Sequence, residues 1–370
     1  MQRHPNLFFK KQNMKKKSLS AKKIIHRNFN FKKILNDKKI YKIYKSFEIN
    51  LKNLNNSVKI AASVSGGPDS LALCFLLACY KFKKNAKIQP SFFLIDHGLR
   101  NNSHKEAISV KNILKSKKLR LKILKWKGKK PNSNLQNLAR KKRYELLFKE
   151  CEKLNIRAVL TGHHQDDMYE TFFSRLLRGS GTEGLSSFAK IESQFNFKNK
   201  KFKVVRPLLN LTKKDLIYVS NIAFKFYVKD PSNELDRFQR ARIRKLISSL
   251  KKEGLDFSKL NLTIKNLAAS NIALNEIVKY NINSNAICLS KKKYLINPEF
   301  FIKPEEVIFR SLSQLIKKIS QREYPPRGKK MITLIRDLKK KQYTKATLGG
   351  TIIEKIHNSV IVYKEKTKKH

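Results

Sequence analysis

Apolar positions along residues 58–205 alternate between short continuous runs and longer stretches at helical spacing. The short runs predict buried strands at residues 58–64, 91–95, 119–126, 158–161 and 202–205. The helical spacing predicts helices at residues 69–82, 104–117, 135–154 and 168–177. Strands that alternate with helices of this length are typical of βαβ units, so we expect an α/β fold with a parallel sheet.

The pattern changes after Asp230-Pro231-Ser232-Asn233. Beyond this point it predicts helices at 236–252, 260–280 and 304–319, and β-hairpins at 286–296 and 345–363. We therefore expect a basic N-terminal extension with a lead-in helix (1–57), an α/β catalytic domain (58–235), a mostly helical linker domain (236–320) and a small C-terminal helix plus β-hairpin (321–370).

Polar motifs follow three of the predicted strands. Ser65–Ser70, Asp96–Arg100 and Gly162–Asp167 each stand where a strand ends. In parallel sheets ligands bind beyond the carboxyl ends of the strands. The coincidence predicts one shared active site.

The first of these motifs, Ser65-Gly66-Gly67-Pro68-Asp69-Ser70, joins a strand to a helix and is suited to a phosphate group. Glycines let the backbone turn tightly and bring N–H groups close to a ligand, and the helix start adds a partial positive charge. Ser65 and Ser70 add hydroxyl donors, while Asp69 would hold Mg²⁺ or cap the helix. The G-x-x-x-x-G-K-[ST] pattern of ordinary P-loops is absent. A plain strand-to-helix turn is the structural alternative.

The charge of the chain is strongly positive, with 83 Lys+Arg against 27 Asp+Glu and a net charge of +56. Such a charge favours an anionic partner, and nucleic acid is the obvious candidate. A compositional bias toward lysine is the alternative explanation. An apolar fraction of 41% argues against a wholly disordered chain.

Cysteine usage and hydropathy limit the other classes of protein. Cys74, Cys79, Cys151 and Cys288 form no C-x-x-C pair, which argues against a disulfide framework, a zinc ribbon or an iron–sulfur cluster held by close cysteines. The longest apolar run, 71–80, is too short to span a bilayer. We therefore expect a cytoplasmic location and no membrane partner. An organellar transit segment is the alternative for the basic start of the chain.

The motif Ser65–Ser70 resembles the SGGxDS loop of the PP-loop, or N-type, ATP pyrophosphatases, whose catalytic domain has the parallel-sheet fold of the adenine-nucleotide α-hydrolases. Further motifs narrow the resemblance to tRNA(Ile)-lysidine synthetases across about residues 58–250. They are Asp96–Arg100, Gln136–Arg140 with Arg143-Tyr144, Gly162–Asp167 with Glu170-Thr171, Arg175–Gly181, Arg206–Leu209 and Asp230–Asn233. Tyr324–Arg327 and Thr347–Gly350 resemble the end of some bacterial members.

The resemblance implies a ligase that modifies the wobble cytidine of an isoleucine tRNA with the anticodon CAU. ATP adenylates the C2 oxygen of this cytidine, pyrophosphate leaves, and the ε-amine of free lysine displaces AMP. The product, lysidine, pairs with adenine and changes the tRNA from methionine to isoleucine identity. The implied substrates are ATP, lysine and the tRNA, with Mg²⁺ as the metal. The oligomeric state stays open, with a homodimer among the options.

Basic and acidic side chains fit this chemistry. Negative charge gathers at the α-phosphate in the transition state, and the guanidinium forks of Arg178 and Arg206 suit it, although either could be a plain surface arginine. Asp166, Asp167 and Glu170 gather carboxylates on one helix face. They would bind Mg²⁺, hold the lysine ammonium or accept a proton from the attacking amine. Which carboxylate does which stays open, and stabilisation of the helix start is the structural alternative.

The predicted roles are therefore as follows. We predict catalytic roles for Asp69, Asp166, Asp167, Arg178 and Arg206. The nucleotide would be bound by residues 65–70 and His163, the lysine by Asp167 and Glu170, and Mg²⁺ by Asp69.

Two further patterns have alternative explanations. His163 and His164 beside two aspartates could form a hydrolytic metal site, although consecutive histidines on an extended segment point opposite ways. Gly179–Gly184 fits G-x-G-x-x-G, yet it follows a helical pattern, so it predicts an active-site loop or a helix cap and no dinucleotide site.

Basic residues on the predicted helix 236–252 are the candidate tRNA contacts. They are Arg237, Arg240, Arg242, Arg244 and Lys245. A PP-loop tRNA thiolase is the nearest alternative function, but the chain has no C-x-x-C pair to deliver sulfur. A non-catalytic tRNA-binding protein is the alternative from another class, and the intact set of carboxylates and arginines argues against it.

Overall fold

The computed structural model describes residues 31–54, 59–84, 87–99, 102–128, 135–228, 239–322, 325–326, 328–340 and 344–365. The N-terminal extension up to residue 30, the motif Asp230–Asn233 and Arg237 lie outside these residues. The chain divides into two compact units. The first comprises Met1–Leu160 with Leu216–Val228, and the second Thr161–Asp215 with Lys229–His370.

A parallel sheet forms the centre of the first unit. Its strands are β1 (Lys59–Val64), β2 (Gln89–Asp96), β3 (Leu121–Lys125) and β4 (Ala158–Leu160). They lie in the order β3-β2-β1-β4, and β1 pairs in parallel with both β2 and β4. Since β1 is nearly fully buried, its apolar residues Ile60, Ala61, Ala62 and Val64 read as a continuous run.

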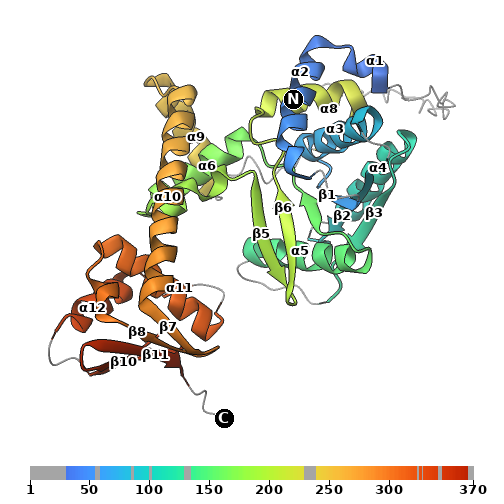
Figure 1. Ribbon diagram of the computed structural model, residues 1–370. Coiled ribbons are helices and arrows are strands. Elements are labelled where there is room, and N and C mark those ends of the chain that lie inside the picture. Colours follow the sequence, from blue (N-terminus) through green and yellow to red (C-terminus); the bar gives the residue numbers. More distant parts are fainter. Residues whose placement is uncertain are drawn as a thin grey trace, which may run out of the picture. The chain divides into compact units, whose positions relative to one another are not determined.

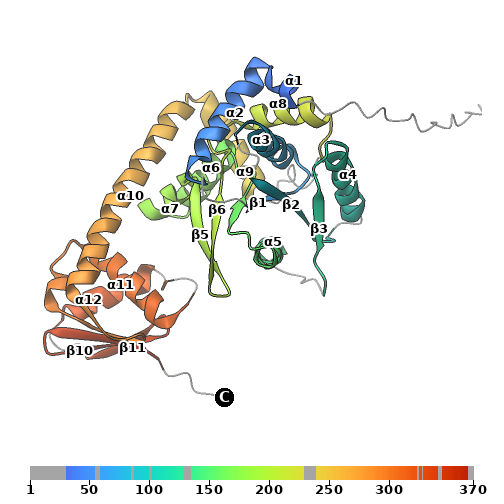
Figure 2. The same ribbon diagram turned by 45° about the vertical axis from the view of Figure 1, so that its right-hand side comes forward.

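Helices cover both faces of this sheet. They are α1 (Phe31–Leu35), α2 (Lys38–Asn50), α3 (Pro68–Lys84), α4 (Ser103–Ser116), α5 (Leu135–Lys153) and, from Leu216 on, α8 (Lys213–Phe224), with a short 3-10 helix at Lys52–Leu54. Figures 1 and 2 show α3 and α5 on opposite faces of the sheet. The side chains from Leu71 to Leu77 are fully buried, which fixes α3 against the strands.

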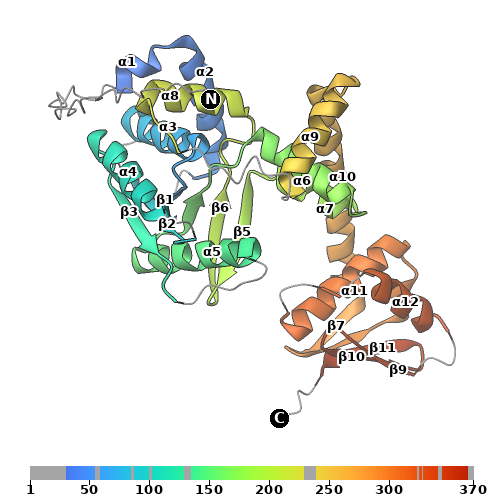
Figure 3. The same ribbon diagram turned by 180° about the vertical axis from the view of Figure 1, so that it is seen from behind.

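The second unit begins with helices and a hairpin. They are α6 (Gln165–Leu176), α7 (Thr182–Ser186), a 3-10 helix (Ser187–Ala189), β5 (Glu192–Phe197), β6 (Lys200–Val205), α9 (Gln239–Lys252) and α10 (Phe257–Asn285). Strands β5 and β6 are antiparallel. Figure 3 shows α6, α7, α9 and α10 grouped together. Their shared core includes Phe172, Phe173, Ile243 and Ile264.

The remaining described part of the second unit, Ala286–Glu365, is called the C-terminal lobe below. Its strands β7 (Ala286–Ser290), β8 (Lys293–Ile296), β9 (Lys345–Leu348), β10 (Thr351–Ile356) and β11 (Ser359–Lys364) form an antiparallel sheet in the order β7-β8-β11-β10-β9. A 3-10 helix (Pro298–Phe301), α11 (Glu305–Ser320) and α12 (Gly328–Leu338) accompany it. One core contains Ile296, Leu312, Leu334 and Val362, so it joins both helices to the sheet (Figure 2).

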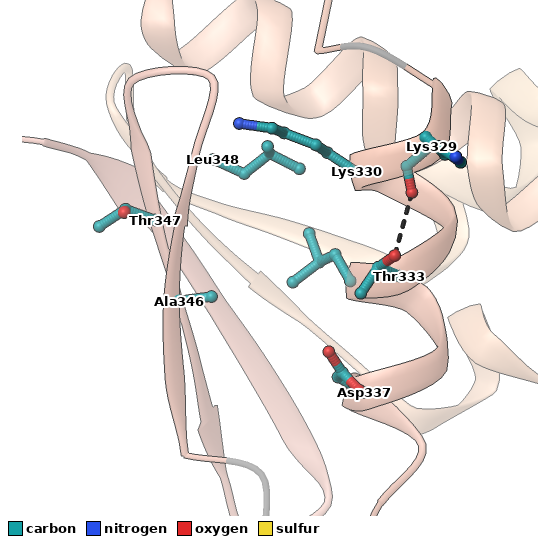
Figure 4. Close-up of a pocket in the computed structure, with 8 residues that line it drawn as sticks. Lys329, Lys330, Thr333, Asp337, Ala346, Thr347 and Leu348 are labelled. Carbon is teal, nitrogen blue, oxygen red and sulfur yellow. Dashed lines mark hydrogen bonds between the residues drawn. The ribbon is translucent and has the colours of Figure 1, made fainter.

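A pocket in this lobe lies between α12 and β9 (Figure 4). Lys329, Thr333 and Asp337 line it from the helix, and Thr347 and Leu348 line it from the strand. The Thr333 hydroxyl donates to the Lys329 carbonyl at 3.1 Å, so it is occupied within its own helix. None of the residues predicted to act in catalysis lines this pocket.

The predicted fold class is confirmed: a parallel-sheet α/β region is followed by helices and a small C-terminal β element. Strand β5 and the helices α7 and α8 were not predicted. The predicted hairpin at Gly349-Gly350 is present as β9 and β10 but belongs to a larger sheet, because β8 pairs with β11. Residues on both sides of the predicted domain limit at residue 320 belong to this one core. The limits of independently folding domains stay a prediction. In the described part of the chain no helix is long and apolar enough to cross a membrane.

Candidate active site

The loop Ser65–Ser70 lies in the first unit, between β1 and α3, and the Ser70 hydroxyl organises it. Ser70 Oγ accepts hydrogen bonds from the backbone N–H groups of Ser65 and Gly66, both at 3.1 Å, and donates to the Gly67 carbonyl at 3.0 Å. The Ser65 hydroxyl also donates to Ser70 Oγ at 3.2 Å. Ser70 is buried, so this hydroxyl holds the tight turn that leads into the helix.

Gly66 is required here for two reasons. Its φ of +87° is a conformation that side chains disfavour. A Cβ at this position would also lie 2.7 Å from Val110 Cγ2 and 3.2 Å from Val228 Cγ2. The Gly66 carbonyl in turn accepts from the Val228 N–H at 2.9 Å. The loop is therefore fixed against α4 and against the chain that follows α8.

Asp69 stands in the first turn of α3, which begins at Pro68. A proline at the first helical position suits a helix start because its missing N–H would have no partner there. The start of a helix of 17 residues attracts anions, through its N–H groups and its dipole. Ser65–Ser70 is thus a tight turn at a helix start with one half-buried carboxylate, and phosphate binding by it stays a prediction.

Asp96 ends β2, the strand next to β1 in the sheet, and was not among the predicted catalytic residues. Its Oδ1 accepts from the Gly98 N–H at 2.9 Å, and its Oδ2 lies 3.1 Å from His104 Nδ1. Burial raises the pKa of this carboxyl, but the hydrogen bonds from Gly98, Ser103 and His104 outweigh burial and hold the pKa below its ordinary value. Asp96 is thus an ionised carboxylate that orders the motif after β2.

In the second unit, the two consecutive histidines before α6 have different surroundings. His163 Nδ1 lies 2.9 Å from Thr161 Oγ1, and its ring meets the Phe188 ring edge-on at 5.3 Å. His164 is buried, with Nδ1 3.3 Å from Asp166 Oδ2 and Nε2 3.5 Å from Asp167 Oδ2. His164 is therefore the histidine that accompanies the carboxylates.

Asp166 and Asp167 hold the start of α6 through backbone groups. Asp167 Oδ2 accepts from the His164 N–H at 3.1 Å, and Asp166 Oδ2 accepts from the Lys213 N–H at 2.8 Å. Burial raises the pKa of Asp166, but His164 and the Lys213 N–H outweigh burial and lower the pKa below its ordinary value. Both carboxylates thus have structural partners beside the predicted catalytic roles.

Glu170 and Arg244, predicted to bind lysine and tRNA respectively, are paired with each other. Arg244 Nε on α9 donates to Glu170 Oε1 on α6 at 2.5 Å. Glu170 is buried, and its Oε2 has no hydrogen-bond partner within the described residues. Burial lowers the pKa of the Arg244 guanidinium, but the hydrogen bond and charge of Glu170 outweigh it and raise the pKa. This ion pair joins α6 to α9.

Arg178 and Arg206 have contrasting environments in the second unit. Arg178 is exposed in the turn after α6, and its guanidinium donates to the side-chain oxygen of Gln239, the first residue of α9. Arg206 is buried after β6, donates to the Lys190 carbonyl at 3.0 Å, and lies over the Phe188 ring at 4.9 Å from its centre. Phe188 therefore contacts both Arg206 and His163, a role that no sequence motif marks.

The other predicted tRNA contacts that the structure describes lie on α9. Arg240, Arg242 and Lys245 are exposed, whereas Ala241 and Ile243 are buried in the core of the second unit. These exposed basic side chains point in different directions around the helix axis, and their contact with tRNA stays a prediction.

Metal ligands and thiols do not gather in the described residues. Among them, no group of three or more His, Cys, Asp or Glu side chains is placed to hold a metal ion. Cys74, Cys79 and Cys151 are buried, and burial raises the pKa of each thiol, that of Cys151 to about 12. These thiols are therefore protonated and poor nucleophiles at neutral pH.

Comparison with known proteins identifies the class to which this fold and its glycine loop belong. Residues 36–250 match the family model of the PP-loop domain. A solved structure with a similar fold is the U34-tRNA thiolase NcsA from Methanococcus maripaludis with its [4Fe-4S] cluster, with a TM-score of 0.52 over 62% of this chain and 79% of the other. The identity is 17%, so this likeness concerns the fold alone.

Curated relatives identify the family within the PP-loop class. The tRNA(Ile)-lysidine synthase of Orientia tsutsugamushi is 33% identical over 320 residues, which cover 83% of this chain and 70% of the relative. That of Wolbachia pipientis wMel is 32% identical, over 85% of this chain and 72% of the relative. The chain belongs to the tRNA(Ile)-lysidine synthase family, a family of PP-loop ligases. The predicted family and enzyme class are thereby confirmed.

Each predicted site residue that the structure describes belongs to one of the two units. Ser65–Ser70 lies in the first, and His163, Asp166, Asp167, Glu170, Arg178, Arg206 and the basic residues of α9 lie in the second. That they serve one reaction stays a prediction.

Proposed function

We propose that this chain ligates free lysine to C2 of the wobble cytidine in the CAU anticodon of an isoleucine tRNA. The observation that carries the proposal is the tight turn Ser65–Ser70 at the start of a long helix, a place where phosphates bind, in a member of the lysidine synthase family. The net charge of +56 and the exposed arginines of α9 support an RNA substrate. The reaction would take place in the cytoplasm, and a homodimer stays a prediction.

In the first step, the C2 oxygen of the cytidine attacks the α-phosphorus of ATP. The bond from this phosphorus to the bridging oxygen of the β-phosphate breaks, and pyrophosphate leaves. We assign phosphate binding to the loop and to the start of α3, and stabilisation of the developing negative charge to Arg178 and Arg206. Burial of Arg206 strengthens such an interaction, because little water is present to screen it. His163 would contact the nucleotide.

In the second step, the ε-amine of lysine attacks C2 and AMP leaves with the former C2 oxygen. Only the neutral amine is nucleophilic, so a carboxylate must accept a proton. We assign Asp167 and Glu170 to the lysine, with Asp166 as a further catalytic carboxylate. Glu170 Oε2 supports this assignment, since it is buried with no partner in the described part of the chain and could accept from an ammonium group.

A Mg²⁺ ion fits beside the loop. Mg²⁺ in nucleotide sites takes one or two carboxylates and completes its shell with phosphate oxygens and water. Asp69, half-buried in the first turn of α3, is such a carboxylate. When bound, the ion would neutralise charge on the phosphates.

The alternative functions have weaker support. A thiolase needs reactive thiols, whereas Cys74, Cys79 and Cys151 are buried with a raised pKa, which leaves Cys288 as the one exposed cysteine. A non-catalytic tRNA-binding protein has no need for a buried carboxylate oxygen without a partner among the described residues, such as Glu170 Oε2.

The test is transfer of labelled lysine to an unmodified isoleucine tRNA with the anticodon CAU. Asp69→Asn should abolish pyrophosphate release and leave tRNA binding nearly unchanged. Release from this variant at the wild-type rate would remove Asp69 from the catalytic set. Absence of lysine transfer by the wild-type chain would refute the proposed function.

A further inference from the structure

Arg310 on α11 is the one charged residue among the buried residues of that helix. Its side chain is 6% exposed, and its other buried neighbours on α11 are apolar residues and serines. Burying a charge is costly, and replacing a buried ion pair by well-packed apolar residues is often neutral or stabilising. Stability alone therefore gives little reason for an arginine at this position.

The guanidinium of Arg310 connects three different elements. Nε donates to Glu306 Oε1 on α11 at 2.7 Å, Nη1 to Asn271 Oδ1 on α10 at 2.6 Å, and Nη2 to Thr182 Oγ1 on α7 at 2.7 Å. Asn271 is 2% exposed, so its amide oxygen has little access to water. Only the planar fork of arginine can serve three acceptors in these directions; a lysine ammonium cannot.

Thr182, the first residue of α7, belongs to the turn that carries Arg178. The residues 177–184 are called the Arg178 turn below. Gly179 has a φ of +66°, and a Cβ on Gly184 would lie 2.8 Å from Ser180 Cβ, so the turn closes tightly on itself. The Arg175 guanidinium donates to the Gly184 carbonyl and the Ser187 hydroxyl. Arg310 holds the same turn from the C-terminal lobe.

We propose that Arg310 is a positioning residue, which fixes the Arg178 turn to the C-terminal lobe and so keeps Arg178 in its working geometry. The inference rests on the proposed function, in which Arg178 stabilises charge at the α-phosphate. A displacement of about 1 Å in a catalytic group can lower a rate roughly 100-fold. Loss of the Arg310 contact should therefore lower the rate of adenylation and leave tRNA affinity nearly unchanged.

The experiment uses the full chain with the variants Arg310→Met, Arg310→Lys and Thr182→Val. Arg336→Met is the matched control, since Arg336 is an exposed arginine on α12 in the same lobe. The single-turnover rate of tRNA adenylation is measured with ATP and tRNA saturating, together with the Kd for tRNA. We expect both Arg310 variants to be about 10- to 100-fold slower, with Kd within about twofold of the wild type. Thr182→Val should be slower too. The double variant, with both Arg310→Met and Thr182→Val, should be no slower than Arg310→Met alone.

A second measurement needs no tRNA. Amide hydrogen exchange of the wild-type chain and the variants reports opening of the Arg178 turn, where Gly179 N–H donates to Leu176 and Ser180 N–H to Arg175. We expect exchange at these amides to be about tenfold faster in Arg310→Met and Thr182→Val than in Arg336→Met. If Arg310→Met does not fold, Arg310→Lys and Thr182→Val carry both measurements.

Several results would overturn the inference. One is an adenylation rate of the Arg310 variants within about twofold of wild type, and another is an equally large loss of rate in Arg336→Met. The others are a double variant whose loss of rate is the product of the two single losses, and unchanged amide exchange in the Arg178 turn. Failure of the wild-type chain to adenylate tRNA would overturn the proposed function instead. The exchange measurement would then still decide whether Arg310 holds the turn.

Discussion

The ion pair between Glu170 and Arg244 allows the sharpest prediction of stability. The change is Arg244→Met, which keeps most of the side-chain length and removes the charge. Glu170 then stays 6% exposed, without the Nε donor that now lies 2.5 Å from its Oε1. Glu170 Oε2 already has no partner among the described residues, so the variant would leave the buried carboxylate without a charged donor on either oxygen.

The size of the effect follows from the exposure of the two side chains. Removing one partner of a fully buried ion pair costs about 3–5 kcal/mol, whereas an exposed pair contributes at most about 1 kcal/mol. Arg244 is 43% exposed, so this pair lies between those limits. We expect a loss of about 2–3 kcal/mol, which corresponds to about a 30- to 150-fold change in an opening equilibrium.

The assay is amide hydrogen exchange in α6 and α9, the two helices that the pair joins. Arg240→Met is the control, because Arg240 is an exposed arginine on the same helix. Exchange in both helices should be about 30- to 150-fold faster in Arg244→Met and nearly unchanged in the control. Adding Glu170→Gln should restore most of the protection, because a neutral amide is less costly to bury than an unpaired carboxylate.

Exchange in Arg244→Met within about threefold of wild type would refute this reasoning, since the pair would then contribute no more than a surface contact. An equal effect of Arg240→Met would refute it as well. The double variant separates the two explanations for a loss: if Glu170→Gln gives no recovery, packing of the Arg244 stem and not charge accounts for it.

Three further predictions follow from the site. Gly66→Ala should abolish ATP binding measured by calorimetry. The control is Gly128→Ala, because Gly128 also has a positive φ but a Cβ there would meet no atom within 4 Å; this variant should lower Tm and leave ATP binding intact. Asp166 has a lowered pKa, so it contributes stability above pH about 4 that is lost as pH falls through its folded pKa. Asp166→Asn should reduce this loss of stability at acid pH, measured by denaturation at a series of pH values. An unchanged dependence of stability on acid pH would contradict the prediction. Phe188→Leu removes a cation–π contact of about 0.5–2 kcal/mol with Arg206, and should lower the adenylation rate about 2- to 30-fold; an unchanged rate would exclude a role for this contact.

Local patterns predicted much of the α/β region. The buried strand β1, the glycine loop and the helix α3 follow one another in sequence, so periodicity and turn chemistry locate them. Strand β5 was missed because its sequence, Glu192–Phe197, is polar and half-exposed. Its hairpin turn is Lys198-Asn199, both with positive φ, in place of the Asn-Gly pair that usually marks such turns.

Contacts between distant residues could not be predicted from one sequence. Glu170 and Arg244 are 74 positions apart, and Thr182 and Arg310 are 128 apart. Each of these side chains has an ordinary local explanation as a surface charge or a helix cap. The pairing of β8 with β11 likewise joins two hairpins that each look independent in the sequence. Charge and motif therefore predicted candidate residues, whereas the contacts between distant residues depend on the fold.

The most direct test of the proposed chemistry measures AMP release from ATP labelled at the α-phosphate. The reactions contain the wild-type chain with lysine alone, with unmodified isoleucine tRNA of anticodon CAU alone, and with both. We expect free AMP only when both are present, with labelled lysine entering the tRNA in equal amount. AMP release with tRNA alone and no lysine transfer would contradict this expectation and indicate another adenylating tRNA modification, and no turnover in any combination would favour a binding protein.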